Sequence, residues 1–167
     1  SLIPGLSQGF VAQVAPAGEL FPQPMVINHA GKTALLDEFT GQSFRVVIAP
    51  GFDAGALLRC LRSSQSLKGL PIHVVRLVSP QQSGPRSADD YQEVNGVLAQ
   101  WLESRGCNVV IVRPDHYVYG GAVTVAWAME LLEGMELALW SKKPEQAAQR
   151  DGGASDPMIR FAQGLSQ

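Results

Sequence analysis

Short runs of apolar, mostly β-branched residues in the middle of the chain predict four β-strands. Turn-forming residues stand at the ends of each run. The predicted strands are residues 44–49, 72–78, 109–112 and 117–119. Because only Arg113-Pro114-Asp115-His116 separates the last two, the chain must return antiparallel there and form a β-hairpin.

Apolar residues at helical spacing predict helices between and after these strands. Asp53 is a suitable N-cap for a helix to about Ser63, and Ser87 followed by Asp90 has the spacing of a capping box. The helix after Ser87 ends at Gly106 and carries one apolar stripe, formed by Tyr91, Val94, Leu98, Trp101 and Leu102.

Three shorter helical segments are also predicted. One turn is expected at 33–39, and a longer segment at 122–132 is expected to break at Gly134. The inward residues of the longer segment are expected to be Val123, Ala126, Trp127 and Leu131. Asp156-Pro157 predicts the start of a short final helix.

The order of these elements predicts an α/β fold of the thioredoxin-like type. Two strand–helix units are followed by a C-terminal hairpin and a helix. Right-handed crossovers make the first two strands parallel, the hairpin adds an antiparallel strand, and helices cover both faces of the mixed sheet. A flavodoxin-like sheet is the rival fold, but it requires a helix rather than a turn near residue 114.

The ends of the chain differ from this core, which predicts three parts. Residues 1–30 contain several prolines and lack periodicity, so we expect an extended lead segment or linker. Residues 31–141 are expected to form the thioredoxin-like domain. Residues 142–167 are polar and contain glycines, which predicts a mobile tail with a short C-terminal helix.

Composition narrows the classes of function. Charged residues make up 17% of the 167 residues against a usual ~25%, which fits either a surface partly covered by another domain or a second subunit, or a small neutral domain. Met135, Leu137, Leu139 and Trp140 are expected to contribute to that apolar face. A net charge of −2 without a basic cluster argues against nucleic-acid binding. The apolar runs are too short to span a membrane, and two cysteines without a CxxC motif fit a reducing cytoplasm.

The position at which thioredoxins carry their redox chemistry lacks a cysteine. That chemistry needs a thiolate at the start of the first helix, where this chain has Pro50-Gly51-Phe52-Asp53. Cys60 and Cys107 are therefore interpreted as structural. Gly51 and Gly55 stand where a phosphate is held in nucleotide-binding proteins, but no dinucleotide or P-loop motif accompanies them.

The remaining polar candidates favour structural roles. The three histidines, His29, His73 and His116, have no metal-ligand spacing to one another or to cysteines and carboxylates. Arg113 and Asp115 flank a proline where a buried strand ends. We interpret them as an ion pair that braces the hairpin rather than as a catalytic pair.

Three stretches of the chain carry a resemblance to a known family. Val112-Arg113-Pro114-Asp115-His116-Tyr117-Val118-Tyr119-Gly120 is similar to a "VRPD-x-YV" signature, and residues 35–44, LLDEFTGQSF, are similar to an "LLDD-x-x-G-x-x-F" stretch. Residues 18–24, GELFPQP, are similar to the segment that opens the C-terminal domain of the same proteins. The proteins that the three stretches resemble are flavin-dependent aromatic hydroxylases, and more narrowly 3-(3-hydroxyphenyl)propionate hydroxylases. The resemblance covers roughly residues 15–133.

The resemblance implies that this chain is one part of a larger enzyme. In such enzymes NAD(P)H reduces FAD, and a flavin hydroperoxide hydroxylates a phenol. The C-terminal part is a thioredoxin-like domain without redox cysteines, implicated in subunit contacts and in packing on the FAD and substrate domains. Only that part is matched here, so the resemblance implies no catalytic residue, cofactor or metal in the fragment itself. The signature residues are then structural, namely Arg113, Pro114, Asp115, Tyr117, Val118 and Gly120.

Two alternatives stay open from the sequence. One is an independent thioredoxin-fold binding module or redox protein, and the other is a nucleotide-binding α/β protein that uses Gly51 and Gly55. A longer reading frame with a dinucleotide-binding motif upstream would decide for the hydroxylase.

Overall fold

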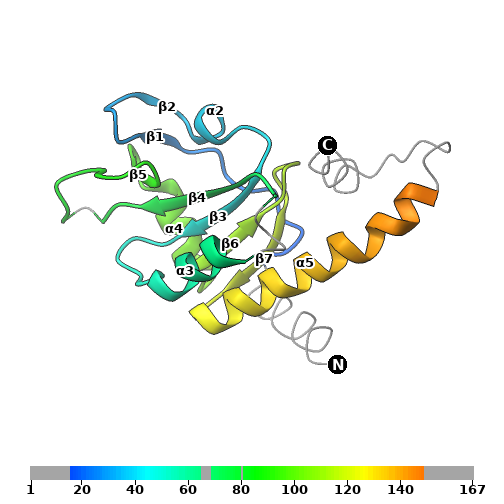
Figure 1. The fold of residues 1–167 in the computed structure, drawn as a ribbon. Helices are drawn as coiled ribbons and strands as arrows, with labels where there is room; N and C mark the ends of the chain where they lie inside the picture. Colours follow the sequence, from blue (N-terminus) through cyan, green and yellow to red (C-terminus); the bar gives the residue numbers. More distant parts are fainter. Residues whose placement is uncertain (1–15, 65–68, 80, 149–167) are drawn as a thin grey trace.

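The structure, a computed structural model, describes residues 16–64, 69–79 and 81–148, with side chains up to residue 139. These residues form a seven-stranded mixed sheet and four helices (Figure 1). The strands are β1 Met25–Ile27, β2 Thr33–Leu35, β3 Phe44–Ile48, β4 Ile72–Leu77, β5 Asp90–Glu93, β6 Val109–Val112 and β7 Val118–Ala122. The helices are α2 Leu36–Thr40, α3 Gly55–Ser63, α4 Val97–Ser104 and α5 Val125–Ala148.

The centre of the sheet has the predicted thioredoxin-like arrangement. The strand order is β2-β1-β5-β4-β3-β6-β7. β3 and β4 are parallel, β6 is antiparallel to β3, and β6 and β7 form the predicted antiparallel hairpin. All five residues of β3 are buried because helices cover both faces at this point.

Two apolar clusters hold the helices on opposite faces of the sheet. α3 and α5 pack with Val46 and Ile48 on one face, and α5 also lies on β6 and β7. Leu98 and Leu102 of α4 pack with Val47 on the other face. In Figure 1, α3 and α5 lie in front of the sheet and α4 lies behind it. The expected covering of both faces is therefore confirmed.

The helix predicted from Ser87 to Gly106 is wrong in its first half. Residues 90–93 form β5, which pairs in parallel with Arg76–Leu77 of β4 and antiparallel with β1. The Asp90 side chain accepts N–H groups from Arg86 and Ser87, so it stabilises a turn rather than a helix start. α4 begins only at Val97, where the Glu93 carboxylate accepts the N–H groups of Leu98 and Ala99.

Strand β2 at the edge of the sheet and its neighbour β1 were missed by the sequence analysis. β1 lies inside the segment expected to be an extended lead, and β2 occupies the first residues of the turn predicted at 33–39. Helix α2 takes up the rest of that turn. Each of these strands has three residues, too few for periodicity to show.

The predicted break at Gly134 is also wrong. Helix α5 begins at Val125, later than expected, and continues through Gly134 to Ala148. Its buried side is formed by Ala128, Leu131, Leu132, Met135 and Leu139. Met135 and Leu139 therefore belong to the core rather than to an exposed apolar face, whereas Leu137 is exposed. The final helix predicted after Asp156 lies outside the described residues.

No helix in the described part of the chain combines the length and the apolar character needed to cross a bilayer.

Candidate functional site

The three stretches that carry the family resemblance meet at one end of the sheet. We call this place the hairpin junction and define it by Gln23, Asp37, Arg45, Arg113, Asp115 and His116. The lead segment joins it along the backbone, since Gly18 N donates to Val118 O and Phe21 N donates to His116 O. The side chain of Gln23 bonds both the carboxylate and the backbone N–H of Asp37.

Arg45 is at the centre of the hairpin junction and is fully buried. Its guanidinium donates from Nη1 to Asp37 Oδ1 at 2.9 Å, from Nε to Ser43 O at 3.2 Å, and from Nη2 to the carbonyl of Arg113. Nη1 also lies 3.1 Å from His116 Nδ1. Burial lowers the pKa of Arg45 from its ordinary value, while the charge and hydrogen bond of Asp37 oppose that shift.

The predicted ion pair within the hairpin loop is present. Arg113 Nη2 donates to Asp115 Oδ2 at 2.6 Å, and Asp115 Oδ1 accepts the N–H of Tyr117. The loop closes with His116 in the left-handed region at φ 72°. The carbonyl of Arg113, just after β6, accepts the guanidinium of Arg45 and the backbone N–H of His116, whereas the Arg113 side chain turns to Asp115.

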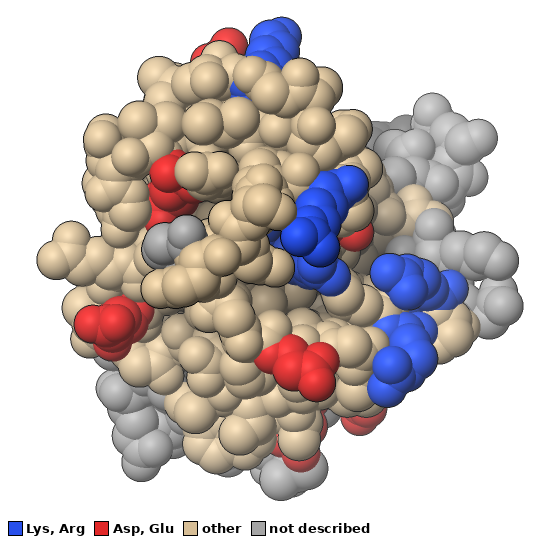
Figure 2. Space-filling model, turned by 90° about the vertical axis from the view of Figure 1, so that its left-hand side faces the viewer, with Lys and Arg blue, Asp and Glu red and all other residues tan. Residues whose placement is uncertain are grey.

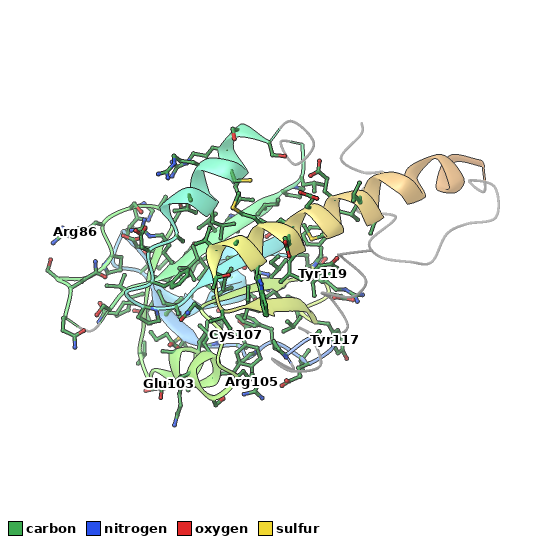
Figure 3. The ribbon with its side chains drawn as sticks, turned by 90° about the horizontal axis from the view of Figure 1, so that it is seen from below. Arg86, Glu103, Arg105, Cys107, Tyr117 and Tyr119 are labelled. Atoms are coloured by element: carbon green, nitrogen blue, oxygen red, sulfur yellow. The ribbon has the colours of Figure 1, made fainter. Side chains whose placement is uncertain are left out.

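The other signature residues lie in the same hairpin. Val118 is buried in the α4-side cluster, and Tyr117 is 45% exposed and pairs with Leu20 in an isolated antiparallel bridge. Gly120 faces α5, where an added Cβ would come within 3.1 Å of Leu131. In Figure 3, Tyr117 lies at the outer end of the hairpin and Tyr119 lies nearer to α5.

Sequence reasoning missed Arg45, Asp37 and Gln23 as members of the site. Arg45 is a charged residue inside a run of strand-forming apolar residues, and this unusual position is the sequence feature that could have identified it. His116 was considered only as a metal ligand, and its spacing to other possible ligands argues against that role. Its Nδ1 lies 3.1 Å from Asp37 Oδ2, a contact across 79 residues that no local pattern reveals. No group of three or more metal-binding side chains occurs within the described ranges.

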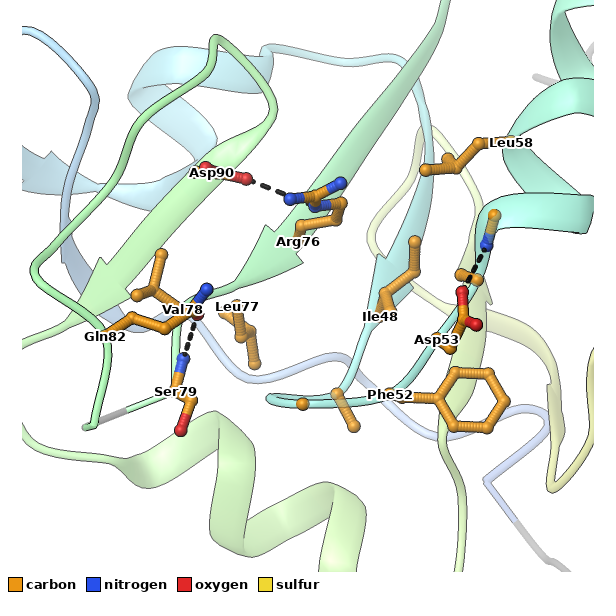
Figure 4. Close-up of a pocket in the computed structure, with 14 residues that line it drawn as sticks. Ile48, Phe52, Asp53, Leu58, Arg76, Leu77, Val78, Ser79, Gln82 and Asp90 are labelled. Atoms are coloured by element: carbon orange, nitrogen blue, oxygen red, sulfur yellow. Dashed lines mark hydrogen bonds and ion pairs between the residues drawn. The ribbon is translucent and has the colours of Figure 1, made fainter.

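A pocket of about 400 Å³ occupies the opposite end of β3, where thioredoxins carry their cysteines (Figure 4). Helix α3 begins there at Gly55, with Ala54 rather than the predicted Asp53 as N-cap. The Asp53 carboxylate accepts the Gly55 N–H at 3.0 Å. Across the pocket, Arg76 Nε lies 3.2 Å from Asp90 Oδ1.

Asp90 is held in its charged form. Burial raises the pKa of this carboxyl, but the N–H donors of Arg86 and Ser87, together with Arg76, more than offset burial, so the pKa lies below its ordinary value. The pocket therefore contains a fixed carboxylate–guanidinium pair and no thiol.

Both cysteines are free thiols away from this pocket. Cys60 lies within α3, and Cys107 is buried before β6, inside the body of the domain (Figure 3). Burial raises the pKa of Cys107 to about 12, which keeps the thiol protonated and unreactive at neutral pH.

The sheet topology and the two helical layers define a thioredoxin-like α/β domain, and the start of α3 lacks the cysteine of its redox members. A solved thiol:disulfide interchange protein from Bacteroides sp. has the same fold, with a TM-score of 0.52, 12% identity, and coverage of 71% of this chain and 88% of that chain.

A family model described as the HcaD C-terminal domain matches residues 18–138, and the chain belongs to this family. The chain is similar to the 3-(3-hydroxy-phenyl)propionate/3-hydroxycinnamic acid hydroxylase of Comamonas testosteroni, with 31% identity over 71% of this chain and 21% of the relative. It is also similar to a probable NADH-specific resorcinol 4-hydroxylase of Rhodococcus jostii (strain RHA1), with 31% identity over 70% of this chain and 20% of the relative. The chain spans about a fifth of the length of these curated relatives. The suspected relation to the C-terminal domain of aromatic hydroxylases is confirmed.

Proposed function

We propose that the chain is the non-catalytic C-terminal domain of a flavin-dependent aromatic-ring monooxygenase of the 3-(3-hydroxyphenyl)propionate hydroxylase type. Its role is to pack on the FAD and substrate domains and to make subunit contacts. The family match over residues 18–138, with relatives of which the matched part is about a fifth, carries this proposal. The parent enzyme would use FAD and NAD(P)H and would work in the cytoplasm.

The start of α3 does not fit a nucleotide cofactor. A phosphate at a helix N-terminus needs free N–H groups. Here the carboxylate of Asp53 already accepts the Gly55 N–H, and it would repel a pyrophosphate. This observation weighs against the alternative of a nucleotide-binding protein built on Gly51 and Gly55.

The surface composition agrees with a domain that is partly covered in a larger protein. On the side shown in Figure 2, most of the described surface is formed by residues other than Lys, Arg, Asp and Glu; most of the basic side chains gather from the centre toward the right, and the acidic ones lie apart. Eight large apolar residues are exposed in the described part of the chain, and they include Leu20, Met25, Leu35 and Tyr117.

The test of a structural rather than catalytic role uses the full-length protein. Arg113→Ala and Asp115→Ala are expected to lower yield or subunit assembly much more than turnover per bound FAD. If either variant keeps normal stability and assembly but abolishes hydroxylation in a fully flavin-loaded enzyme, these residues are catalytic and the proposal is wrong.

The alternative of an independent redox protein has a direct test with this chain alone. The purified chain is expected to be colourless and to reduce insulin no faster than a Cys60→Ser, Cys107→Ser double variant. Retained FAD at stoichiometric level, or turnover above that variant, would contradict the proposed function.

A further inference from the structure

Strands β1 and β2 carry apolar residues on both of their faces. Val26 and Ala34 point into the fold and are buried, at 0% and 8% exposed. Their neighbours Met25 and Leu35 point to the other side and are 40% and 37% exposed. An antiparallel sheet with one solvated face normally carries polar residues at its outward positions, so apolar residues there are typical of a sheet covered twice.

Three of the exposed apolar side chains are neighbours on this outward face. Met25 lies directly opposite Leu35 in the β1–β2 pair. On the other side of β1, the N–H of Val94 donates to Met25 O at 3.0 Å, which places Val94 opposite Met25. Because opposite residues in an antiparallel pair share a face, the three side chains form a row across the sheet. We call Met25, Leu35 and Val94 the β1 patch.

The helices of the described chain leave the β1 patch uncovered. α5 packs on β6 and β7 and against α3, at the other end of the sheet. In Figure 1, both helices lie away from β1 and β2. The next row on the same face is formed by Thr33 and Gln92, which are exposed and uncharged, with the half-buried Ile27 between them. Exposed apolar side chains bordered by polar residues are the composition of a protein–protein contact.

Contacts within the domain occupy part of each edge of the sheet. At the β2 edge, the N–H of Leu35 donates to the Glu38 carboxylate at 3.2 Å. At the β7 edge, the lead segment bonds Val118 through Gly18 and Glu19. These contacts limit the backbone groups that a further strand could pair with, so the side chains of the exposed face are the surface that we consider for a partner.

We propose that the β1 patch is the surface on which the preceding part of the full-length hydroxylase chain packs. This inference rests on the proposed function. About four fifths of each curated relative lies outside the matched length, so such a chain has ample surface for the contact. A specific contact buries on the order of 1,000 Å², more than three side chains supply, so the β1 patch would form its centre.

Hydroxyl-radical footprinting of the full-length protein and of this chain alone tests the proposal, with oxidation of Met25 as the reporter. Met25 is expected to oxidise several-fold more slowly in the full-length protein. Val94→Glu is expected to restore the faster rate, whereas Val123→Glu, the same change at a valine of similar exposure outside the patch, is expected to leave the protection intact. Leu35→Glu with Leu137→Glu as its control repeats the comparison if a valine variant fails to fold.

The other possible footprinting results distinguish failure of the β1 patch from failure of the packing function. Protection elsewhere on the domain with Met25 oxidised at the same rate in both proteins would overturn the β1 patch and leave the packing function standing. Equal oxidation at every residue would overturn the packing function itself. Protection of Met25 in this chain alone that rises with protein concentration would assign the patch to a second copy and overturn the proposed occupant.

Discussion

Among single substitutions in the hairpin junction, Arg45→Met should lower the free energy of unfolding most. Methionine keeps much of the side-chain volume but removes every donor. Asp37 then loses the cation at 2.9 Å, and the carbonyls of Ser43 and Arg113 lose a buried N–H group each. Because Arg45 is fully buried, little water can reach these acceptors in its place.

The expected loss of unfolding free energy depends on how deeply the ion pair of Arg45 and Asp37 is buried. Removing one partner of a buried ion pair costs about 3–5 kcal/mol of unfolding free energy. The Asp37 side chain is 23% exposed and retains Gln23 and His116 as partners, so we take the lower end, about 3 kcal/mol. In a domain of this size that loss lowers Tm by about 6–12 °C.

Arg113→Met is the matched control, because it removes an arginine from the same junction. The side chains of Arg113 and Asp115 are 33% and 28% exposed, and such pairs contribute about 1 kcal/mol or less. Urea unfolding followed by tryptophan fluorescence reports both variants, since Trp101 packs against Phe21 in the fold. Asp37→Leu added to Arg45→Met should recover part of the loss by removing the unpaired carboxylate.

The reasoning about the hairpin junction is refuted if Arg45→Met costs no more than Arg113→Met. It is also refuted if the double variant with Asp37→Leu is less stable than Arg45→Met alone.

Three further predictions concern other parts of the domain. Asp90→Asn should lower the free energy of unfolding at pH 7. Because the folded pKa of Asp90 is depressed, the carboxylate stabilises the fold above about pH 4 and loses this effect at lower pH. Urea unfolding at pH 3 should therefore show a smaller difference between the variant and the unaltered chain, and an equal difference would contradict the role of the charge. The Cys107 thiol, with its pKa raised to about 12, should react with a disulfide reagent at pH 8 only after unfolding, and equally fast labelling of Cys60 and Cys107 in the folded chain would count against its burial. Gly121→Ala places a Cβ 2.6 Å from Cys107 Sγ and 2.8 Å from Pro16 Cγ, so it should lower the free energy of unfolding by about 1–3 kcal/mol, and Cys107→Ala should restore part of the loss. Gly120→Ala meets only the flexible end of Leu131 and should lower it less in the same unfolding assay.

The sequence by itself determined the centre of the fold. β3, β4 and the β6–β7 hairpin were predicted because each is a run of strand-forming residues that ends in a local turn signal. The C-terminal end of α3 at Ser63 was also correct. The family relation followed from three short stretches, and the ion pair between Arg113 and Asp115 followed from their position on either side of one proline.

Tertiary structure alone decided the edge of the sheet. β1, β2 and β5 have three or four residues each, and their pairing with neighbouring strands stabilises them rather than any local propensity. The stripe from Tyr91 to Leu102 matched a helical period, yet Tyr91 reaches the same cluster from a strand, and Val94 is exposed. Helix α5 passes through Gly134 because the residues around that glycine pack on the sheet, which outweighs the cost of about 1 kcal/mol for glycine in a helix.

The hairpin junction shows most clearly that local sequence patterns do not reveal contacts between distant segments. Arg45 lies 8 residues from Asp37 but 68 from Arg113 and 71 from His116. A charged residue in a strand-forming run is unusual in sequence, but only the pairing of β3 with β6 brings its guanidinium to the end of the hairpin. A buried cation needs carboxylate and carbonyl partners from every segment around it, and the folded chain alone determines which segments those are.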